Sequence, residues 1–528
     1  MKIVVLWVFV LLISFPGGNY AQNSSPAVAK GAEKFSNKPR LIRGPYLQVA
    51  TDTSMVIRWR TDASTRARVR VGTTPGELNK NIDDLSLQTE HKILVKGLTP
   101  NTRYYYSIGT LKDTLQYGPD NYFNTLPVPG KEGTYRIGVF GDCGYLSVNQ
   151  LNVRDQFVKY LGNNELNAWI LLGDNAYNDG NDMEYQAKFF NPYKETLLKK
   201  YPVFPTPGNH DYHDADFTAE FAQQTHTTPY YQNFSMPEKG EAGGVASGNP
   251  AFYSFDIGNI HFISLDSYGM EENKYFLFDT LGPQVEWLKK DLAANRNKGW
   301  VVVYSHYPPY SKGTHDSDTD GIMTGIRENL LRVLDNYEVD LVICGHSHVY
   351  ERSRLMKGHY GKSDSFDAAK HNLSSSSGMY TSKTNPAAPY IKEPGINKGA
   401  VYVVTGTSSY VSKAAYTFPH PAMFYSNDTD AGAVMLEINE NRLDFKWICG
   451  DGVIRDQFTM MKNVNRKSEI KIKKGETVTL TASFVSDYRW SNQANTRSIT
   501  VSPQNTTTFT VTDTGNYLTD SFKIVVTK

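Results

Sequence analysis

Apolar runs that are typical of β-strands alternate with helical patterns between residues 133 and 462. The strand candidates are Tyr135–Phe140, Ala168–Leu172, Ile260–Leu265, Trp300–Tyr304, Leu341–Cys344 and Ala400–Thr405. The helical candidates between them include Met183–Lys199, Pro283–Ala294 and Gly325–Tyr337. Because such an alternation favours a substantially parallel or mixed sheet covered by helices, this region is predicted to form an α/β sandwich of mixed β-sheets flanked by helices.

The regions on either side of this α/β block are rich in strand patterns. Residues 39–126 contain Leu98–Tyr104, which resembles the corner between two strands of fibronectin type III-like sandwiches, and Trp59 and Tyr104 suit that fold. Residues 463–528 contain Thr-rich strand candidates and a lone large core candidate, Trp490. We therefore expect an N-terminal fibronectin type III-like β-sandwich and a small C-terminal immunoglobulin-like β-domain.

The first 21 residues (1–21) have the pattern of an export signal. Lys2 precedes an apolar run that ends at Phe15, and Ala21 offers a cleavage position. The run is shorter than the stretch of about 20 apolar residues that spans a bilayer, and no later stretch approaches that length. We expect a secreted, periplasmic or cell-surface protein with no integral membrane segment after signal removal.

The charge balance and the cysteine pattern indicate which partners and which covalent cross-links to expect. Lys and Arg number 55 and Asp and Glu number 54, so electrostatics gives no reason to expect nucleic acid as a partner. Three widely spaced cysteines, Cys143, Cys344 and Cys449, do not resemble a disulfide framework. Cys143 and Cys344 lie in or beside apolar runs and are expected to be buried free thiols.

Five short motifs place metal-binding residue types at or just beyond the ends of the predicted strands. They are Gly141-Asp142-Cys143-Gly144, Gly173-Asp174-Asn175-Ala176-Tyr177, Gly208-Asn209-His210-Asp211, Val303-Tyr304-Ser305-His306 and Gly345-His346-Ser347-His348. Loops converge at the carboxyl edge of an α/β sheet, so residues from distant positions can meet there. Carboxylate, imidazole, amide and phenolate groups suit iron, manganese or zinc. Each motif alone is a weak signal, but five in order predict a metal site.

The five motifs, GDxG, GDxxY, GNH, VxxH and GHxH, resemble those of the purple acid phosphatase family within the calcineurin-like metallophosphoesterases. The segments Gln284–Leu292 and His348–Ser353 are also similar to that family, and the resemblance covers residues 39–462 but not the tail. It implies a secreted acid phosphatase that hydrolyses phosphate monoesters by attack of metal-activated water or hydroxide. Small phosphorylated molecules would be its substrates.

The resemblance also implies a role for each motif residue. A ferric ion would be held by Asp142, Asp174, Tyr177 and His348, and a second, divalent ion (iron, zinc or manganese) by the bridging Asp174 with Asn209, His306 and His346. Tyr177 is the discriminating residue, because a phenolate on iron(III) gives the family its colour.

Substrate contacts are expected from Asn209, His210, His315 and Arg352, with His210 and His315 as the candidate catalytic residues. His210 would bind phosphate or protonate the leaving group. His315 stands where plant-like members place a second substrate histidine. The adjacent Asp316 stands where they have another histidine, so the resemblance does not identify the group that protonates the leaving group. For Arg352, pairing with a carboxylate is the alternative to a phosphate contact.

Other interpretations stay open on the sequence alone. The metal ligands do not distinguish a phosphomonoesterase from a phosphodiesterase or nucleotidase, because specificity depends on loops such as Lys357–Lys398. His359 and His371 in that loop are expected to be solvated. A catalytically inert cell-surface binding protein would also carry two flanking β-modules, although here all seven predicted ligands are present. The C-terminal domain could contact the cell surface or a glycan.

Overall fold

The computed structural model describes residues 38–213, 222–380, 387–393 and 398–528. The predicted export signal, 1–21, lies outside these described residues. Residues Pro39–Lys528 form one compact unit. The boundaries 39–126, 133–462 and 463–528 therefore stay a prediction from the sequence.

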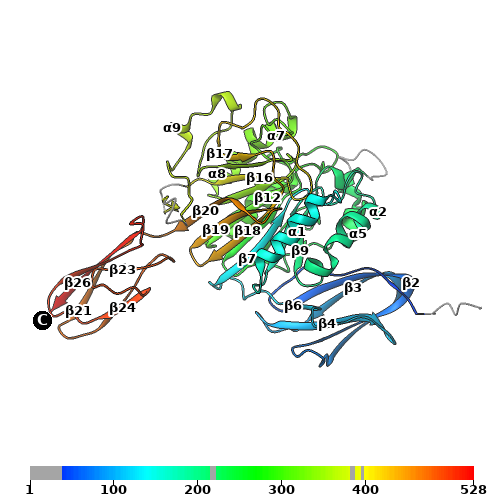
Figure 1. Ribbon diagram of the computed structural model, residues 1–528, viewed down its shortest axis with the longest axis horizontal. Helices are drawn as coiled ribbons and strands as arrows, with labels where there is room; N and C mark the ends of the chain where they lie inside the picture. The colour runs from blue at the N-terminus through cyan, green and yellow to red at the C-terminus, as the bar shows by residue number, and fades with distance from the viewer. Residues whose placement is uncertain (1–37, 214–221, 381–386, 394–397) are drawn as a thin grey trace, which may run out of the picture. The chain divides into compact units, whose positions relative to one another are not determined.

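A larger and a smaller mixed β-sheet form the central part of the chain (Figure 1). The larger sheet contains, in spatial order, β15 (Tyr390–Lys392), β20 (Ile454–Lys462), β19 (Arg442–Cys449), β18 (Gly432–Asn439), β7 (Thr134–Phe140), β8 (Ala168–Leu172) and β9 (Pro202–Thr206). The smaller sheet contains β10 (Tyr253–Ile257), β11 (Ile260–Ser264), β12 (Trp300–Ser305), β13 (Leu341–Cys344), β16 (Val401–Thr405), β14 (Tyr350–Ser353) and β17 (Met423–Asn427). All six predicted strands are present, with bounds that agree to within one residue.

The strands that carry the motifs run parallel within each sheet. β7 pairs with β8 and β8 with β9 in the larger sheet, while β11, β12, β13 and β16 pair successively in the smaller one. Flanking strands such as β18, β10 and β14 pair antiparallel. Strands β8, β9, β12 and β13 are buried along their whole length and β7 is buried from Ile137 onward, which explains their largely continuous apolar sequences.

Helical segments connect these strands. Between β8 and β9 lie α2 (Asp182–Glu184), a π-helical turn (Tyr185–Phe190), α3 (Asn191–Tyr193) and a second π-helical turn (Lys194–Leu198), where the sequence predicted one helix. The predicted helix before β12 is α6 (Pro283–Ala294), and the third is divided into α7 (Gly321–Gly325), a π-helical turn (Ile326–Leu330) and α8 (Leu331–Asn336). Shorter segments are His210–Tyr212, α4 (Ala222–Thr225), α5 (Pro229–Asn233), Ser363–Ser365 and α9 (Ala368–His371).

Helix α1 (Val148–Leu161) follows β7 and packs against β18 and β19. It begins where the Ser147 hydroxyl accepts the Gln150 N–H at 3.0 Å, and it ends before Gly162, whose φ is 57°. These are the expected side-chain cap and glycine terminator of a helix. The ring of Phe157 meets that of Phe140 on β7 at 5.0 Å, so α1 covers the strand that leads into the first motif.

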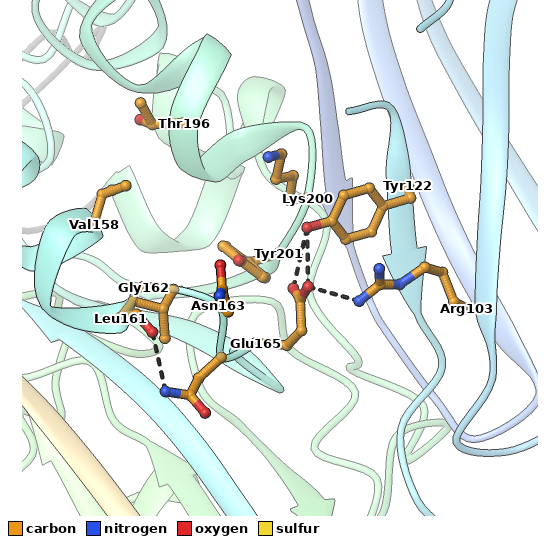
Figure 2. A pocket seen from close by; sticks show the side chains of 11 residues that line it. Arg103, Tyr122, Val158, Leu161, Gly162, Asn163, Glu165, Thr196, Lys200 and Tyr201 are labelled. Carbon is orange, nitrogen blue, oxygen red and sulfur yellow. Dashed lines mark hydrogen bonds and ion pairs between the residues drawn. The ribbon is translucent and has the colours of Figure 1, made fainter. Parts of the chain in front are cut away.

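The N-terminal strands are β1 (Leu41–Gln48), β2 (Ser54–Gly72), β3 (Lys80–Lys96), β4 (Arg103–Thr110), β5 (Thr114–Gln116) and β6 (Tyr122–Asn124). Trp59 is fully buried, and the Tyr104 hydroxyl accepts the Thr99 N–H at 2.9 Å, as expected for the corner. β1 also pairs in parallel with β9. Figure 2 shows a further connection, between the N-terminal strands and the segment that joins α1 to β8. Glu165 in that segment accepts hydrogen bonds from Arg103 (2.6 Å) and from the Tyr122 hydroxyl (3.0 Å).

The C-terminal strands have a small core of their own. They are β21 (Lys467–Lys473), β22 (Val478–Thr481), β23 (Arg489–Trp490), β24 (Ser498–Val501), β25 (Thr507–Thr512) and β26 (Thr519–Thr527). Trp490 is buried, as expected, but it packs with Phe522 and shares the core with Phe484. The C-terminal region is therefore β-rich, and its immunoglobulin-like character stays a prediction. Cys143, Cys344 and Cys449 are buried and free.

In the long loop after β14, two histidines differ from the prediction made from the sequence. His359 and His371 are only 2% and 5% exposed, so the prediction that they are solvated is wrong. Their rings lie 5.0 Å apart, and His359 also stacks on the buried Tyr310 at 5.7 Å. The polar composition of the loop gave no indication of this contact, because the aromatic partner, Tyr310, comes from a distant segment. In the described part of the chain, every helix is too short or too polar to cross a membrane.

Candidate metal centre

The five motifs lie at the carboxyl ends of β7, β8, β9, β12 and β13, where side chains from all five come together. Ligand atoms of Asp142, Asp174 and His306 lie within 4.8 Å of one another, and all three residues are buried. They come from motifs that are up to 164 residues apart in the chain. The convergence that the strand pattern predicts is therefore present.

Asp142, Tyr177 and His348 form one side of this cluster. The Tyr177 hydroxyl donates to Asp142 Oδ1 at 2.9 Å and lies 3.1 Å from His348 Nε2, which is 3.4 Å from the same carboxylate oxygen. Burial, followed by the charges of Asp142 and Asp174, raises the pKa of the Tyr177 phenol well above its usual value. Without a cation the phenol stays protonated, and a trivalent cation among these oxygens would reverse that preference.

Asp174, Asn209 and His306 form the other side. His306 donates through Nδ1 to the Leu172 carbonyl at 2.8 Å, and its Nε2 lies 3.3 Å from Asp174 Oδ2 and 3.2 Å from Asn209 Oδ1. Burial opposes a charge on His306, but the Asp174 carboxylate outweighs burial and raises the pKa of His306 to about 9. The Nε2 atom of His306 thus lies close to a carboxylate oxygen and an amide oxygen, an arrangement that suits a cation.

His346 shows most directly that these residues fit a metal. Its Nε2 is buried and has no hydrogen-bond partner among the described residues. Its ring lies between those of Tyr307 and His315, each 3.8 Å away. Burial, followed by the neighbouring His306, lowers the pKa of His346 well below its usual value. A neutral imidazole with an unshared, buried nitrogen is expected to bind a ligand, since orphaned buried polar atoms are rare.

The backbone is strained at three of the predicted ligands. Asp142, Asp174 and His346 have φ values of 55°, 50° and 66°, a region that non-glycine residues seldom occupy. Glycines provide the space around them. A Cβ at Gly208 would lie 2.3 Å from Asp174 Oδ1, and one at Gly345 would lie 2.3 Å from Asp142 Oδ2. Backbone strain of this kind is typically found at active sites and ligand-binding sites.

Asp211 is a positioning residue to which the sequence assigned no role, although it ends the third motif. Its fully buried carboxylate accepts the Gly208 N–H at 2.8 Å and the Asn175 N–H at 3.1 Å, and also the Tyr185 hydroxyl. It therefore joins the second motif to the third. Burial, followed by the Asp174 charge, raises the pKa of Asp211 to about 7.

The two candidate catalytic histidines both border the cluster. His210 donates through Nδ1 to the Asn178 carbonyl at 2.5 Å, which leaves Nε2, 3.9 Å from Asp174 Oδ2, facing the cluster. His315 covers the ring of His346. His213, which the sequence did not indicate, is exposed and donates to the same Asn178 carbonyl at 3.1 Å. Asp316 accepts two hydrogen bonds from Lys312.

Arg352 is the predicted substrate residue that the structure does not bring to the cluster. It is fully buried, and its guanidinium donates to both carboxylate oxygens of Asp456, at 2.6 and 2.8 Å. Asp456 lies on β20 of the larger sheet and Arg352 on β14 of the smaller sheet. The expectation of a phosphate contact is therefore corrected to a structural ion pair between the sheets.

Two family models match the chain and together cover more than half of it. Residues 135–350 match the calcineurin-like phosphoesterases, and residues 42–125 match the purple acid phosphatase N-terminal domain. Purple acid phosphatase 23 of Arabidopsis thaliana is 29% identical over 288 residues, which are 50% of this chain and 57% of that protein. Purple acid phosphatase 15 of the same plant is 30% identical over 50% of this chain and 49% of its own length. The matches thus span about half the length of these curated relatives.

Among solved structures, a purple acid phosphatase from yellow lupin (Lupinus luteus) seeds matches with a TM-score of 0.59 and 18% identity. The match covers 80% of this chain and 74% of that one. This likeness shows a common fold. The predicted α/β metallophosphoesterase fold, with an N-terminal β-sandwich and a C-terminal β-rich region, is thereby confirmed.

Proposed function

Because this chain belongs to the purple acid phosphatase family of calcineurin-like phosphoesterases, we propose that it is a metal-dependent acid phosphatase that hydrolyses small phosphate monoesters. The observation that carries the proposal is the convergence of Asp142, Asp174 and His306. The ring of His346 lies 5.0 Å from that of His306, and its buried Nε2 has no hydrogen-bond partner among the described residues. Secretion, which rests on the pattern of residues 1–21, is part of the same proposal.

The family implies a binuclear metal centre, and the donor set fits one. We assign the finer details as the sequence predicted them, with iron(III) held by Asp142, Asp174, Tyr177 and His348, and a divalent iron, zinc or manganese ion held by Asp174, Asn209, His306 and His346. Two such ions, when bound, would lower the pKa of a bound water, orient phosphate oxygens and offset the charge that develops during displacement. The mixture of oxygen and imidazole donors supports hard or borderline cations.

The chain's own residues position the substrate and transfer the proton. The Asn178 carbonyl accepts the Nδ1 proton of His210, so the Nε2 atom of His210 can hold a second proton for a phosphate oxygen or the leaving oxygen. Asp211 keeps the loops of the second and third motifs at a fixed spacing through its buried hydrogen bonds. His315 borders the other part of the cluster through its stack on His346.

An absorption spectrum, metal analysis and a paired ester assay on one purified sample test the proposal. We expect about two metals per chain, iron among them, a broad visible band, and faster hydrolysis of the monoester than of the diester of one chromogenic phenol. Faster hydrolysis of the diester would identify a phosphodiesterase instead. Failure to bind metal after reconstitution, together with no hydrolysis of either ester, would refute the enzyme assignment and favour an inert binding protein.

A further inference from the structure

Two partly exposed tyrosines, Tyr145 and Tyr410, lie beside the predicted iron ligands. Their rings stack on each other, with centroids 4.9 Å apart and planes inclined by 29°. The Tyr145 ring is 5.5 Å from that of Tyr177, and the Tyr410 ring is 5.3 Å from that of His348. The two residues are 41% and 37% exposed. We call this pair the aromatic shelf.

The aromatic shelf is fixed to the backbone of the predicted ligands. The Ser409 hydroxyl, next to Tyr410, donates to the carbonyl of Asp142. Two residues after Tyr410, the Ser412 N–H donates to the His348 carbonyl at 3.2 Å. On the other side, the Tyr177 N–H donates to the carbonyl of Gly144, next to Tyr145, at 3.0 Å. Both tyrosines are therefore held relative to the cluster, and they would lose little further side-chain entropy when a ligand stacks on them.

We propose that the aromatic shelf binds an aromatic leaving group, so that the preferred substrates are phosphate monoesters with an aromatic ring close to the phosphate. This inference rests on the proposed function, which places the phosphate at the metal cluster. In an aryl phosphate, the ring bonded to the ester oxygen lies a few ångströms from phosphorus. The rings of the aromatic shelf lie at separations of similar size from the rings of Tyr177 and His348. Stacking on a partly exposed tyrosine stabilises a bound ring, whereas an alkyl group gains less.

The test compares phenyl phosphate with an alkyl phosphate of similar size. In Tyr145→Leu and in Tyr410→Leu, we expect the ratio of kcat/KM for the phenyl ester to that for the alkyl ester to fall by about tenfold. Tyr410→Phe keeps the ring and should retain the ratio. The matched control is Tyr416→Leu, because Tyr416 is 99% exposed on the same loop and should leave both values unchanged.

Calorimetric binding of phenylphosphonate and methylphosphonate to the metal-loaded protein gives a readout that needs no turnover. We expect tighter binding of the phenyl compound, and loss of that preference in both leucine variants. An equal loss for both compounds, or no change, would overturn the aromatic shelf and leave Tyr145 and Tyr410 as a cover over Tyr177. If no ester is hydrolysed but the phenyl preference depends on the two tyrosines, the shelf stands and the proposed activity falls.

Discussion

Replacement of Arg352 by methionine tests the ion pair that connects the two sheets. Arg352 donates to both oxygens of Asp456 and also to the Tyr390 hydroxyl at 3.0 Å. Burial opposes the charge of Arg352, but Asp456 outweighs burial and holds the pKa of the guanidinium above its usual value. In Arg352→Met, the buried Asp456 carboxylate would keep the Tyr350 hydroxyl (2.8 Å) as its side-chain donor.

We expect Arg352→Met to lower the free energy of unfolding by about 3–5 kcal/mol, the usual cost of an uncompensated buried charge. Arg352→Met combined with Asp456→Leu should recover at least half of that loss, because no charge is then left buried. Arg455→Met is the matched control on β20. Arg455 is 26% exposed in its side chain and pairs with Asp451, so its loss should cost less than about 1 kcal/mol.

Urea unfolding followed by tryptophan fluorescence measures these differences, and the KM for phenyl phosphate is measured on the same proteins. We expect the KM of folded Arg352→Met to stay within about twofold of the parent value, since an ion pair between the sheets does not touch phosphate. A large rise in KM with an unchanged free energy of unfolding would refute the reasoning. It would restore Arg352 as a phosphate-binding residue.

Three further predictions concern the ligands and one buried carboxyl. Tyr177→Phe should keep the fold but remove the visible band of the iron-loaded protein, and an unchanged spectrum would refute the Tyr177 assignment. Asp174→Ala should lose both ions in elemental analysis, because its carboxylate is predicted to bridge them; full metal content would contradict this. Burial raises the pKa of Glu271 from 4.5 to about 7, so its protonated form stabilises the fold below about pH 4.5 and this contribution is lost as the pH rises to 7. Glu271→Gln should therefore gain up to about 3 kcal/mol relative to the parent at pH 8 but little at pH 4.5, and an equal difference in urea unfolding at both pH values would contradict it.

The sequence alone determined the strands and the motifs that follow them. Strands such as Ala168–Leu172 and Leu341–Cys344 are buried along their whole length, so continuous apolar runs mark their bounds. A glycine beside an aspartate or histidine at the end of such a run marks the turn that carries a ligand. Because parallel strands bring their carboxyl ends together, the order of the motifs was enough to predict that Asp142, Asp174 and His306 meet.

Only the tertiary structure decided which distant side chains pair. Arg352 and Asp456 are 104 residues apart, and nothing in their local patterns connects them. The burial of His359, the stack of Tyr145 on Tyr410 and the role of Asp211 likewise depend on loops that meet after the sheets have formed. The physical reason is that periodicity specifies which face of an element is buried, whereas the partner of a buried or stacked polar group is set by the packing of separate elements.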